Sequence, residues 1–234
     1  MGIMQLGVDH LQILREYQPR ERDELSLMKA AVSMILRDGE RGAEVLLMQR
    51  AFHPKDPWSG QMCFPGGKID PSDLTSRDAA QREAFEEVGV QLQEQDYIGR
   101  LDDLYGLKVN KVFSVHIACY VFKPERDLQL TANDEVADMV WLPLSFLNDP
   151  RNAHDFVHPS APEMAMPAVM IDQEKSQILW GLTLRMLSNF HNVLGQNMAV
   201  LSEAERQELR EIELREASPS VVKRIENELA EREA

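Results

Sequence analysis

The chain has 234 residues, of which 44% are hydrophobic, so it is long enough for one domain with an extension or for two small domains. Its formal net charge of −14 and its pI of about 4.9 argue against non-specific binding to nucleic acid, which needs a basic surface. Small anionic substrates remain compatible with this charge, because a bound metal ion supplies positive charge locally.

Cysteine usage and hydropathy narrow the class of protein further. Cys63 and Cys119 each lie inside an apolar, strand-like run, so we expect two buried free thiols and no disulfide framework. No apolar run approaches the roughly 20 residues that a membrane-spanning helix needs. The amino terminus has no basic region followed by an apolar stretch. We therefore expect a soluble, cytoplasmic protein with neither a membrane nor a nucleic-acid partner.

The first quarter of the chain alternates strand patterns with turn residues. In chain order, the predicted elements are a helix at 9–17, a hairpin of strands at 29–37 and 43–49, a loop at 51–60 and a short strand at 61–64.

The next segment, Gly66 to Val90, reads GGKIDPSDLTSRDAAQREAFEEVGV and predicts a double-glycine turn followed by a capped helix. Thr75 is a good N-cap residue, and Asp78 three positions later completes a capping-box pattern. Gly89 stands where a helix needs a left-handed residue at its carboxyl end. The two glycines at the start allow the backbone to approach a ligand or metal closely.

This predicted helix places three glutamates on one face. Glu83, Glu86 and Glu87 are spaced i, i+3 and i+4, and Arg82 and Glu86 form an i, i+4 pair. Like charges this close repel unless a cation neutralises them, and oxygen ligands favour Mg²⁺ or Mn²⁺. The apolar residues that fall roughly opposite and are expected to face the core are Ala84, Phe85 and Val88.

The segment resembles the signature of the Nudix hydrolases, G-x5-E-x7-R-E-U-x-E-E-x-G-U, where U is a bulky apolar residue. The matching residues are Gly67, Arg82, Glu83, Glu86, Glu87, Gly89 and Val90. Asp73 replaces the first glutamate, Ala84 is small where the pattern has bulk, and the gap from Gly67 to Arg82 is one residue longer. The resemblance covers roughly residues 29–145 and implies the Nudix fold, an α/β/α sandwich.

The longer gap and the Phe-Pro-Gly-Gly run are similar to the coenzyme A pyrophosphatase branch, whose extra motif is L-L-T-x-R-S/A followed by R-x3-G-x3-F-P-G-G. Residues 46–51 resemble its first part, and residues 60–67 match the end of its second part. Asp56 stands where this motif has its arginine. An aspartate there would repel a substrate phosphate, which argues against coenzyme A itself unless Arg50 or Lys55 substitutes.

The resemblance suggests roles for residues in and near the signature. Glu83, Glu86 and Glu87 are the expected metal ligands, Arg82 is expected to orient them, and the Gly66 and Gly67 backbone to complete the substrate cradle. Water activated by the metal would then attack one phosphorus of a pyrophosphate.

Other candidate site residues lie outside the signature. Arg50 is a candidate substrate contact, and Trp58 either stacks on the substrate or anchors its loop. Glu135, next to Asp134, is the candidate general base, and the alternative is an ordinary acidic turn. A second acidic pair, Asp102 and Asp103, could bind metal or cap a loop, and we favour the loop.

The second half predicts two more strands, at 112–122 and 136–142. Residues 148–175 contain four prolines and are predicted to be irregular, with a lid over the site as one role. Residues 177–194 predict an apolar helix. Strands interrupted by one strong helix favour an α/β protein with a mixed sheet and helices on its faces.

Beyond Gly195 the composition becomes highly charged, and two helical patterns at 202–216 and 219–233 have thin apolar stripes. Such stripes are too narrow to fold alone, so we expect them to pack either on the domain or on a second subunit of a homodimer. The predicted organisation is an N-terminal helical segment at 1–28, a Nudix hydrolase domain at 29–195 and a charged helical C-terminal extension at 196–234.

Three functions remain open at this point. The favoured one is Mg²⁺-dependent hydrolysis of a pyrophosphate bond in a small nucleoside diphosphate derivative similar to coenzyme A. The second is the same chemistry on ADP-ribose, dinucleotides or nucleoside triphosphates. The third is a non-catalytic Nudix-fold binding module, which is less favoured because such modules usually lose signature carboxylates and all three are present here.

Overall fold

The computed structural model describes residues 4–211, apart from residues 23, 55, 57, 110, 111 and 159–164. Its α-helices are α1 (Val8–Glu16), α2 (Ser76–Val88), α3 (Gly181–Val193) and α4 (Glu203–Glu211). Its strands are β1 (Lys29–Gly39), β2 (Gly42–Arg50), β3 (Met62–Cys63), β4 (Gly66–Lys68), β5 (Tyr97–Arg100), β6 (Leu104–Tyr105), β7 (Lys108–Val109), β8 (Val112–Phe113), β9 (His116–Phe122), β10 (Val136–Pro143), β11 (Ala153–Val157), β12 (Ala165–Asp172) and β13 (Gln177–Trp180).

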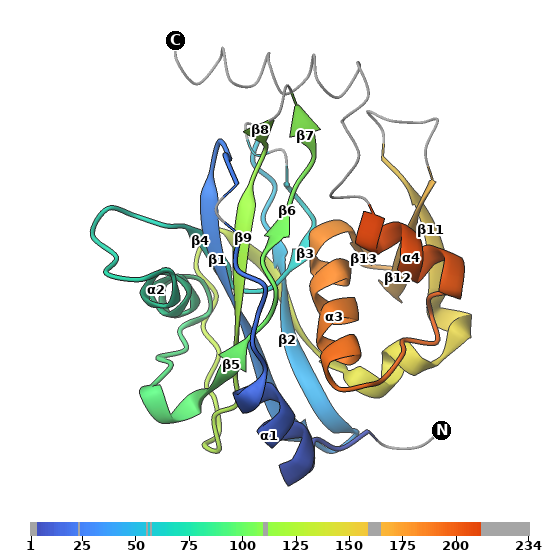
Figure 1. Cartoon of the computed structure of the whole chain (residues 1–234), viewed down its shortest axis with the longest axis horizontal. Coiled ribbons are helices and arrows are strands. Elements are labelled where there is room, and N and C mark those ends of the chain that lie inside the picture. Colours follow the sequence, from blue (N-terminus) through green and yellow to red (C-terminus); the bar gives the residue numbers. More distant parts are fainter. Residues whose placement is uncertain are drawn as a thin grey trace.

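A mixed eight-stranded sheet forms the centre of the molecule (Figure 1). Its main path runs β10-β2-β1-β9-β5, with β3 beside β2, β4 beside β1 and β6 beside β9. β1 and β9 are parallel, and the other pairs of this sheet are antiparallel. The parallel pair at the centre requires long connections, and the β4–α2 segment lies within one of them.

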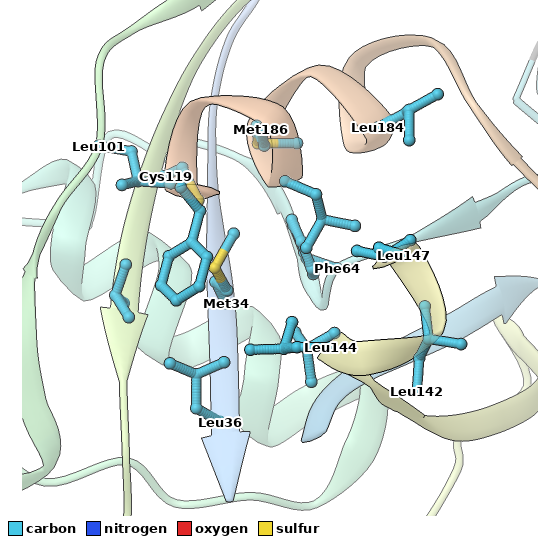
Figure 2. Packing of buried hydrophobic residues seen from close by; sticks show 14 of the residues in the cluster. Met34, Leu36, Phe64, Leu101, Cys119, Leu142, Leu144, Leu147, Leu184 and Met186 are labelled. Carbon is cyan, nitrogen blue, oxygen red and sulfur yellow. The ribbon is translucent and has the colours of Figure 1, made fainter. Parts of the chain in front are cut away.

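Helices cover both faces of this sheet. Ala31 and Ile35 of β1 belong to the cluster that packs under α2, whereas Met34 and Leu36 point to the opposite face, against α3 (Figure 2). Because side chains alternate along a strand, a strand covered on both faces is apolar almost throughout. The predicted α/β/α sandwich with a mixed sheet is confirmed.

Both ends of α2 are as predicted. The Thr75 hydroxyl accepts a hydrogen bond from the Asp78 N–H, the Asp78 carboxylate accepts one from the Thr75 N–H, and Gly89 has a φ of 73°. The prediction for Phe85 is wrong, since 57% of its surface is exposed. The sheet-facing side of the helix is set by its small residues, Ala80 and Ala84, and Phe85 lies about 100° further round the helix.

The prediction that 148–175 is irregular is wrong, because β11 and β12 form an antiparallel sheet with β13. Pro150 and Pro167, the prolines of this segment that the structure describes, lie where a sheet tolerates them. Pro150 begins a short 3-10 helix, and Pro167 lies beyond the last β12–β13 pair, where β12 has a neighbour on one side only.

Two other element boundaries also differ from the prediction. The helix expected at 177–194 begins only at Gly181, because the preceding four residues form β13. Gly181 has a φ of 63°, so the chain changes direction there. The strand expected at 112–122 is divided into β8, which pairs with β7, and β9, which pairs with β1.

In the C-terminal region, α4 accounts for the start of the helix predicted at 202–216, and the helix predicted at 219–233 lies outside the described residues. No helix within the described part of the chain is long and apolar enough to cross a membrane. Both cysteines are free thiols as expected, with Cys119 buried and Cys63 only half-buried.

Candidate active site

The double glycine of β4 lies against the glutamates of α2. The Gly66 N–H donates a 2.8 Å hydrogen bond to Glu87 Oε2. A Cβ atom at Gly67 would lie 2.6 Å from the Glu83 carboxyl carbon, and one at Gly66 would lie 2.4 Å from the Ala31 carbonyl oxygen. At Gly66 the contact is with backbone and excludes a side chain, whereas at Gly67 a side chain would require the Glu83 carboxylate to move. Backbone and carboxylates therefore form one surface.

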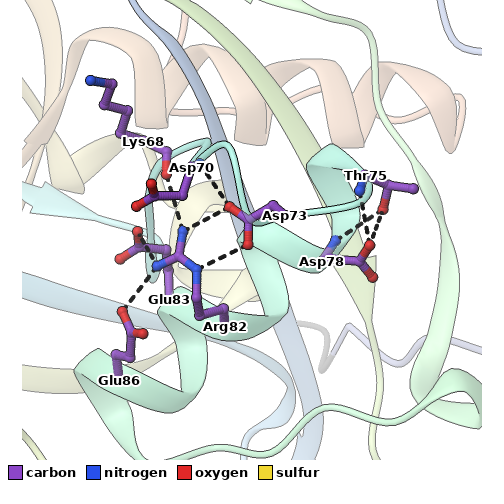
Figure 3. A network of polar contacts seen from close by, with 8 residues as sticks. All are labelled: Lys68, Asp70, Asp73, Thr75, Asp78, Arg82, Glu83 and Glu86. Carbon is purple, nitrogen blue, oxygen red and sulfur yellow. Dashed lines mark hydrogen bonds and ion pairs between the residues drawn. The ribbon is translucent and has the colours of Figure 1, made fainter.

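Arg82 is the centre of the polar network beside this surface (Figure 3). Its Nε and one terminal nitrogen each lie 3.0 Å from Asp73, and its other terminal nitrogen lies 2.8 Å from Glu83 and 3.0 Å from Glu86. The hydrogen bond from Arg82 lowers the pKa of Asp73. Arg82 thus contacts Glu83 and Glu86, two of the three glutamates that it was expected to orient. Asp73, the departure from the signature, is the residue that anchors Arg82.

Glu87 is the least neutralised of the three glutamates. Only 2% of its surface is exposed, and burial raises its pKa to about 8, with a further upward contribution from the charges of Glu83 and Glu135. The hydrogen bond from the Gly66 N–H and the charge of Arg50 lower the pKa of Glu87, but by less than burial raises it. Burial also raises the pKa of Glu83, despite its hydrogen bond from Arg82. Glu86 is different, because half of its side chain is exposed.

Glu135 lies near these carboxylates although it comes from the turn before β10. Its carbonyl oxygen accepts a 2.8 Å hydrogen bond from Ala51 N–H, just beyond the end of β2. Its negative charge raises the pKa of both Glu83 and Glu87, so its side chain is within electrostatic range of both. The structure therefore brings Glu135 to the predicted site, although Glu135 and neighbouring Asp134 are both exposed.

Arg50, at the end of β2, faces the same site. One of its terminal nitrogens lies 3.8 Å from Glu87 Oε1, and its Nε donates a 2.8 Å hydrogen bond to Asp56 Oδ2. Burial alone would lower the pKa of Arg50, but the surrounding negative groups, Asp56 first among them, raise it. Asp56 is therefore paired with Arg50, one of the two residues expected to substitute for the missing arginine. Lys55, the other candidate, lies outside the described residues.

Two further residues lie close to Arg50. The Trp58 N–H donates a 3.0 Å hydrogen bond to Asp56 Oδ1, and the Trp58 side chain is half-buried. Burial, followed by the charge of Glu87, raises the pKa of the Cys63 thiol to about 12, so this thiol is protonated at neutral pH. Cys63 is a site neighbour that the sequence showed only as a strand residue.

The second acidic pair lies in a different environment. Asp102 accepts hydrogen bonds from Tyr17 Oη and, at 2.7 and 2.9 Å, from the Arg20 guanidinium. Asp103 is contacted by Arg100 at 2.5 Å and has His116 Nε2 at 2.9 Å. These contacts outweigh burial and lower the pKa of both aspartates. The pair ties the N-terminal segment to the sheet, as the favoured loop alternative predicts.

The glutamate site fits a hard divalent cation. Among the described residues, no three carboxylate, imidazole or thiol side chains already converge as metal ligands do. Glu83, Glu87 and Glu135 are nevertheless oxygen donors. The charge of Glu135 raises the pKa of Glu83 and of Glu87, and a divalent ion would reverse that effect. Oxygen donors with this excess of negative charge suit Mg²⁺ or Mn²⁺.

Comparison with known proteins identifies relatives for the central part of the chain. A family model described as the NUDIX domain matches residues 27–162. A probable Nudix hydrolase of Schizosaccharomyces pombe is 35% identical over 120 residues, which are 51% of this chain and 41% of the relative. Nudix hydrolase 3 of Caenorhabditis elegans is 30% identical over 129 residues, 54% of this chain and 51% of the relative.

The uncharacterized Nudix hydrolase NudL of Salmonella typhimurium is 36% identical over 123 residues, 49% of this chain and 62% of the relative. The matched part thus spans about half the length of the curated relatives.

Solved structures are similar at a lower level. The NUDIX domain of Shewanella oneidensis NrtR, complexed with ADP ribose, is 23% identical over 57% of this chain and 82% of that chain, with a TM-score of 0.41. A MutT/nudix family protein from Enterococcus faecalis is 15% identical over 95% of this chain and 87% of that chain, with a TM-score of 0.49. TM-scores below 0.5 describe a partial similarity, and no functional conclusion follows from them.

Proposed function

The chain belongs to the Nudix family, and from this premise we propose that it is a pyrophosphohydrolase that cleaves the pyrophosphate bond of a nucleoside diphosphate derivative with Mg²⁺ or Mn²⁺. The observation that supports the proposal most directly is Glu87. A carboxylate that is 2% exposed and has a pKa of about 8 is destabilised unless a cation reaches it.

The residues of the site have separable roles in this proposal. Glu83, Glu86 and Glu87 would hold the cation, which supplies positive charge to the phosphate oxygens and a more acidic water molecule. Arg82, fixed by Asp73, holds Glu83 and Glu86 at hydrogen-bonding distance. Glu135, on a separate element, would accept the proton of the attacking water. The oxygen of that water joins one phosphorus as the bridging P–O bond breaks.

We propose a coenzyme A-like molecule as the favoured substrate. Two observations support this choice: the LLMQRA and FPGG runs resemble the coenzyme A branch, and the Asp56 carboxylate, the departure from that branch, is bonded to Arg50. Arg50 would contact the diphosphate, and Trp58 would contact the remainder of the substrate.

The test is to incubate the purified protein with Mg²⁺, and separately with Mn²⁺, and a panel of pyrophosphate compounds. The panel contains coenzyme A, ADP-ribose, NADH, diadenosine polyphosphates and nucleoside triphosphates, with products identified by mass spectrometry in ¹⁸O-labelled water. The label identifies the phosphorus that water attacks. The Glu87→Gln variant, which keeps the size and an acceptor oxygen, is the matched control.

Each outcome has a defined meaning. Release of 3′,5′-ADP and 4′-phosphopantetheine from coenzyme A supports the favoured substrate. Turnover of another panel member alone keeps the chemistry and changes the substrate. Absence of turnover with both ions contradicts a catalytic function and favours a non-catalytic binding module.

A further inference from the structure

Asp56 makes two contacts that fix its position. Its Oδ2 accepts a 2.8 Å hydrogen bond from Arg50 Nε, and its Oδ1 accepts a 3.0 Å hydrogen bond from the Trp58 N–H. Its own N–H donates to the His53 carbonyl oxygen at 3.0 Å. The carboxylate is therefore held by its loop from one side and by Arg50 from the other.

The contact with Asp56 also fixes the orientation of Arg50. An arginine on a strand end has several rotatable bonds, and holding it in one rotamer before a ligand arrives removes an entropic cost from binding. With Nε directed at Asp56, the guanidinium presents a terminal nitrogen 3.8 Å from Glu87 Oε1. The Arg50 side chain is 25% exposed, so the protein does not enclose it completely.

The same pair leaves the glutamate site negatively charged. Arg50 lies 2.8 Å from Asp56 and 3.8 Å from Glu87, so its charge is balanced first by Asp56. An Arg50 without this partner would neutralise Glu87 more completely and would compete there with a divalent cation. Because of Asp56, the same site can contain an arginine that binds an anion and carboxylates that bind a cation.

We propose that Asp56 is a positioning residue that holds the Arg50 guanidinium beside Glu87, where it engages an anionic oxygen of the substrate's diphosphate. Asp56 acts only through Arg50 and does not itself contact the substrate. The identity of the substrate in this inference rests on the proposed function. The geometry of the Asp56–Arg50 pair does not depend on that function.

The sharpest variant is Asp56→Asn. Its amide oxygen can still accept the Trp58 N–H, so the loop keeps its cap, but its amide NH₂ faces Arg50 Nε–H and two donors do not pair. Asp149→Asn is the matched control. Asp149 also accepts a hydrogen bond from the backbone N–H two residues later and pairs with an arginine, Arg151, but it caps the short 3-10 helix before β11.

Two measurements are made on both variants and on the wild type. The first is kcat and KM for the panel compound that the wild type hydrolyses. The second is the affinity for adenosine 5′-(α,β-methylene)diphosphate with Mg²⁺, measured by calorimetry, since this analogue reports binding without turnover. Thermal unfolding of each variant shows whether it is folded.

For Asp56→Asn we expect KM and the analogue Kd to rise about tenfold, with kcat within about threefold of wild type, as for the loss of one oriented, charge-assisted contact. Asp149→Asn should leave both constants unchanged. In an Arg50→Ala background, where KM and Kd are already raised, Asp56→Asn should add nothing, because its effect passes through Arg50.

Three results would overturn the inference: unchanged KM and Kd in Asp56→Asn, an equal further loss in the Arg50→Ala background, or a wild type that does not bind the analogue. A wild type that binds the analogue but hydrolyses no panel compound contradicts the proposed function alone. The binding comparison then still decides the role of Asp56.

Discussion

Two acidic clusters in this protein have similar compositions and opposite electrostatics. In the pair Asp102–Asp103, contacts with Arg20, Arg100 and His116 lower the pKa of both aspartates despite their burial. At the glutamate site, burial raises the pKa of Glu83 and Glu87 above the ordinary value. The two clusters differ in the balance between their carboxylates and the cations beside them.

This difference separates a structural cluster from a candidate cation site. Every carboxylate oxygen of the aspartate pair already has a partner, so an added cation would have to displace an arginine or a backbone N–H. At the glutamate site, Arg82 is shared with Asp73 and Arg50 is shared with Asp56, which leaves Glu87 without a full counter-charge. In the proposed function, this sharing of arginines is the feature that would prepare the site for a metal.

The largest effect should come from Glu87→Gln. If Glu87 holds the cation, this variant should lower Mg²⁺-dependent kcat by about 1,000-fold, since one charged ligand is worth roughly 4 kcal/mol of transition-state stabilisation. Without metal at pH 8.5, where Glu87 is ionised, its melting temperature should be equal to or above that of the wild type, because a poorly neutralised charge is removed. The measurement is steady-state kinetics together with thermal unfolding.

The matched change in the other cluster is Asp102→Asn. It should cost about 1–3 kcal/mol of unfolding free energy, because the partners of Asp102 lose their acceptor. The turnover of each folded molecule should stay close to that of the wild type. If Glu87→Gln retained near-wild-type turnover, or if Asp102→Asn abolished it in folded protein, the functional contrast between the clusters would be wrong.

A smaller effect is expected from Gly67→Ala. The added Cβ would lie 2.6 Å from the Glu83 carboxyl carbon, so the carboxylate must move away from the backbone. We expect kcat/KM to fall by about 10- to 100-fold, as for a displacement of about 1 Å in a catalytic group. Gly7→Ala is the control, because no atom lies within 4 Å of its added Cβ. Equal kinetics of the two variants would show that the Glu83–Gly67 contact is not used.

The sequence predicted those features that depend on near neighbours. The caps of α2 follow from Thr75, Asp78 and Gly89, which act within one helical turn. The prediction for Phe85 failed because the rotation of α2 is set by how Ala80 and Ala84 fit the sheet, and neighbouring residues along the chain do not show that fit.

Features that depend on distant pairing were missed. β11 and β12 stabilise each other across a segment with several prolines, and their pairing has no local signal. The Asp56–Arg50 and Asp73–Arg82 pairs depend on the course of two loops, so the sequence showed both aspartates only as departures from a motif. A residue that departs from the motif of its family can therefore have an ion-pair partner that only the structure shows.

The smallest predicted effect concerns pH. The folded protein raises the pKa of Glu87 from 4.5 to about 8, so it binds this proton more tightly than the unfolded chain does. The stability that the folded state gains from this bound proton is complete below about pH 4.5 and is lost as the pH rises toward 8. A cation that binds the ionised carboxylate restores this stability. We therefore expect 5 mM Mg²⁺ to raise the melting temperature by about 2–4 °C more at pH 8.5 than at pH 6.

The two clusters should differ in this experiment as well. The pKa values of Asp102 and Asp103 are lowered, so their contribution is present throughout this range and is lost only as the pH falls through their folded pKa values. The pH-dependent gain from Mg²⁺ should therefore persist in Asp102→Asn and disappear in Glu87→Gln. If the gain from Mg²⁺ persisted in Glu87→Gln, the cation would have to bind elsewhere, because this variant lacks the carboxylate that titrates.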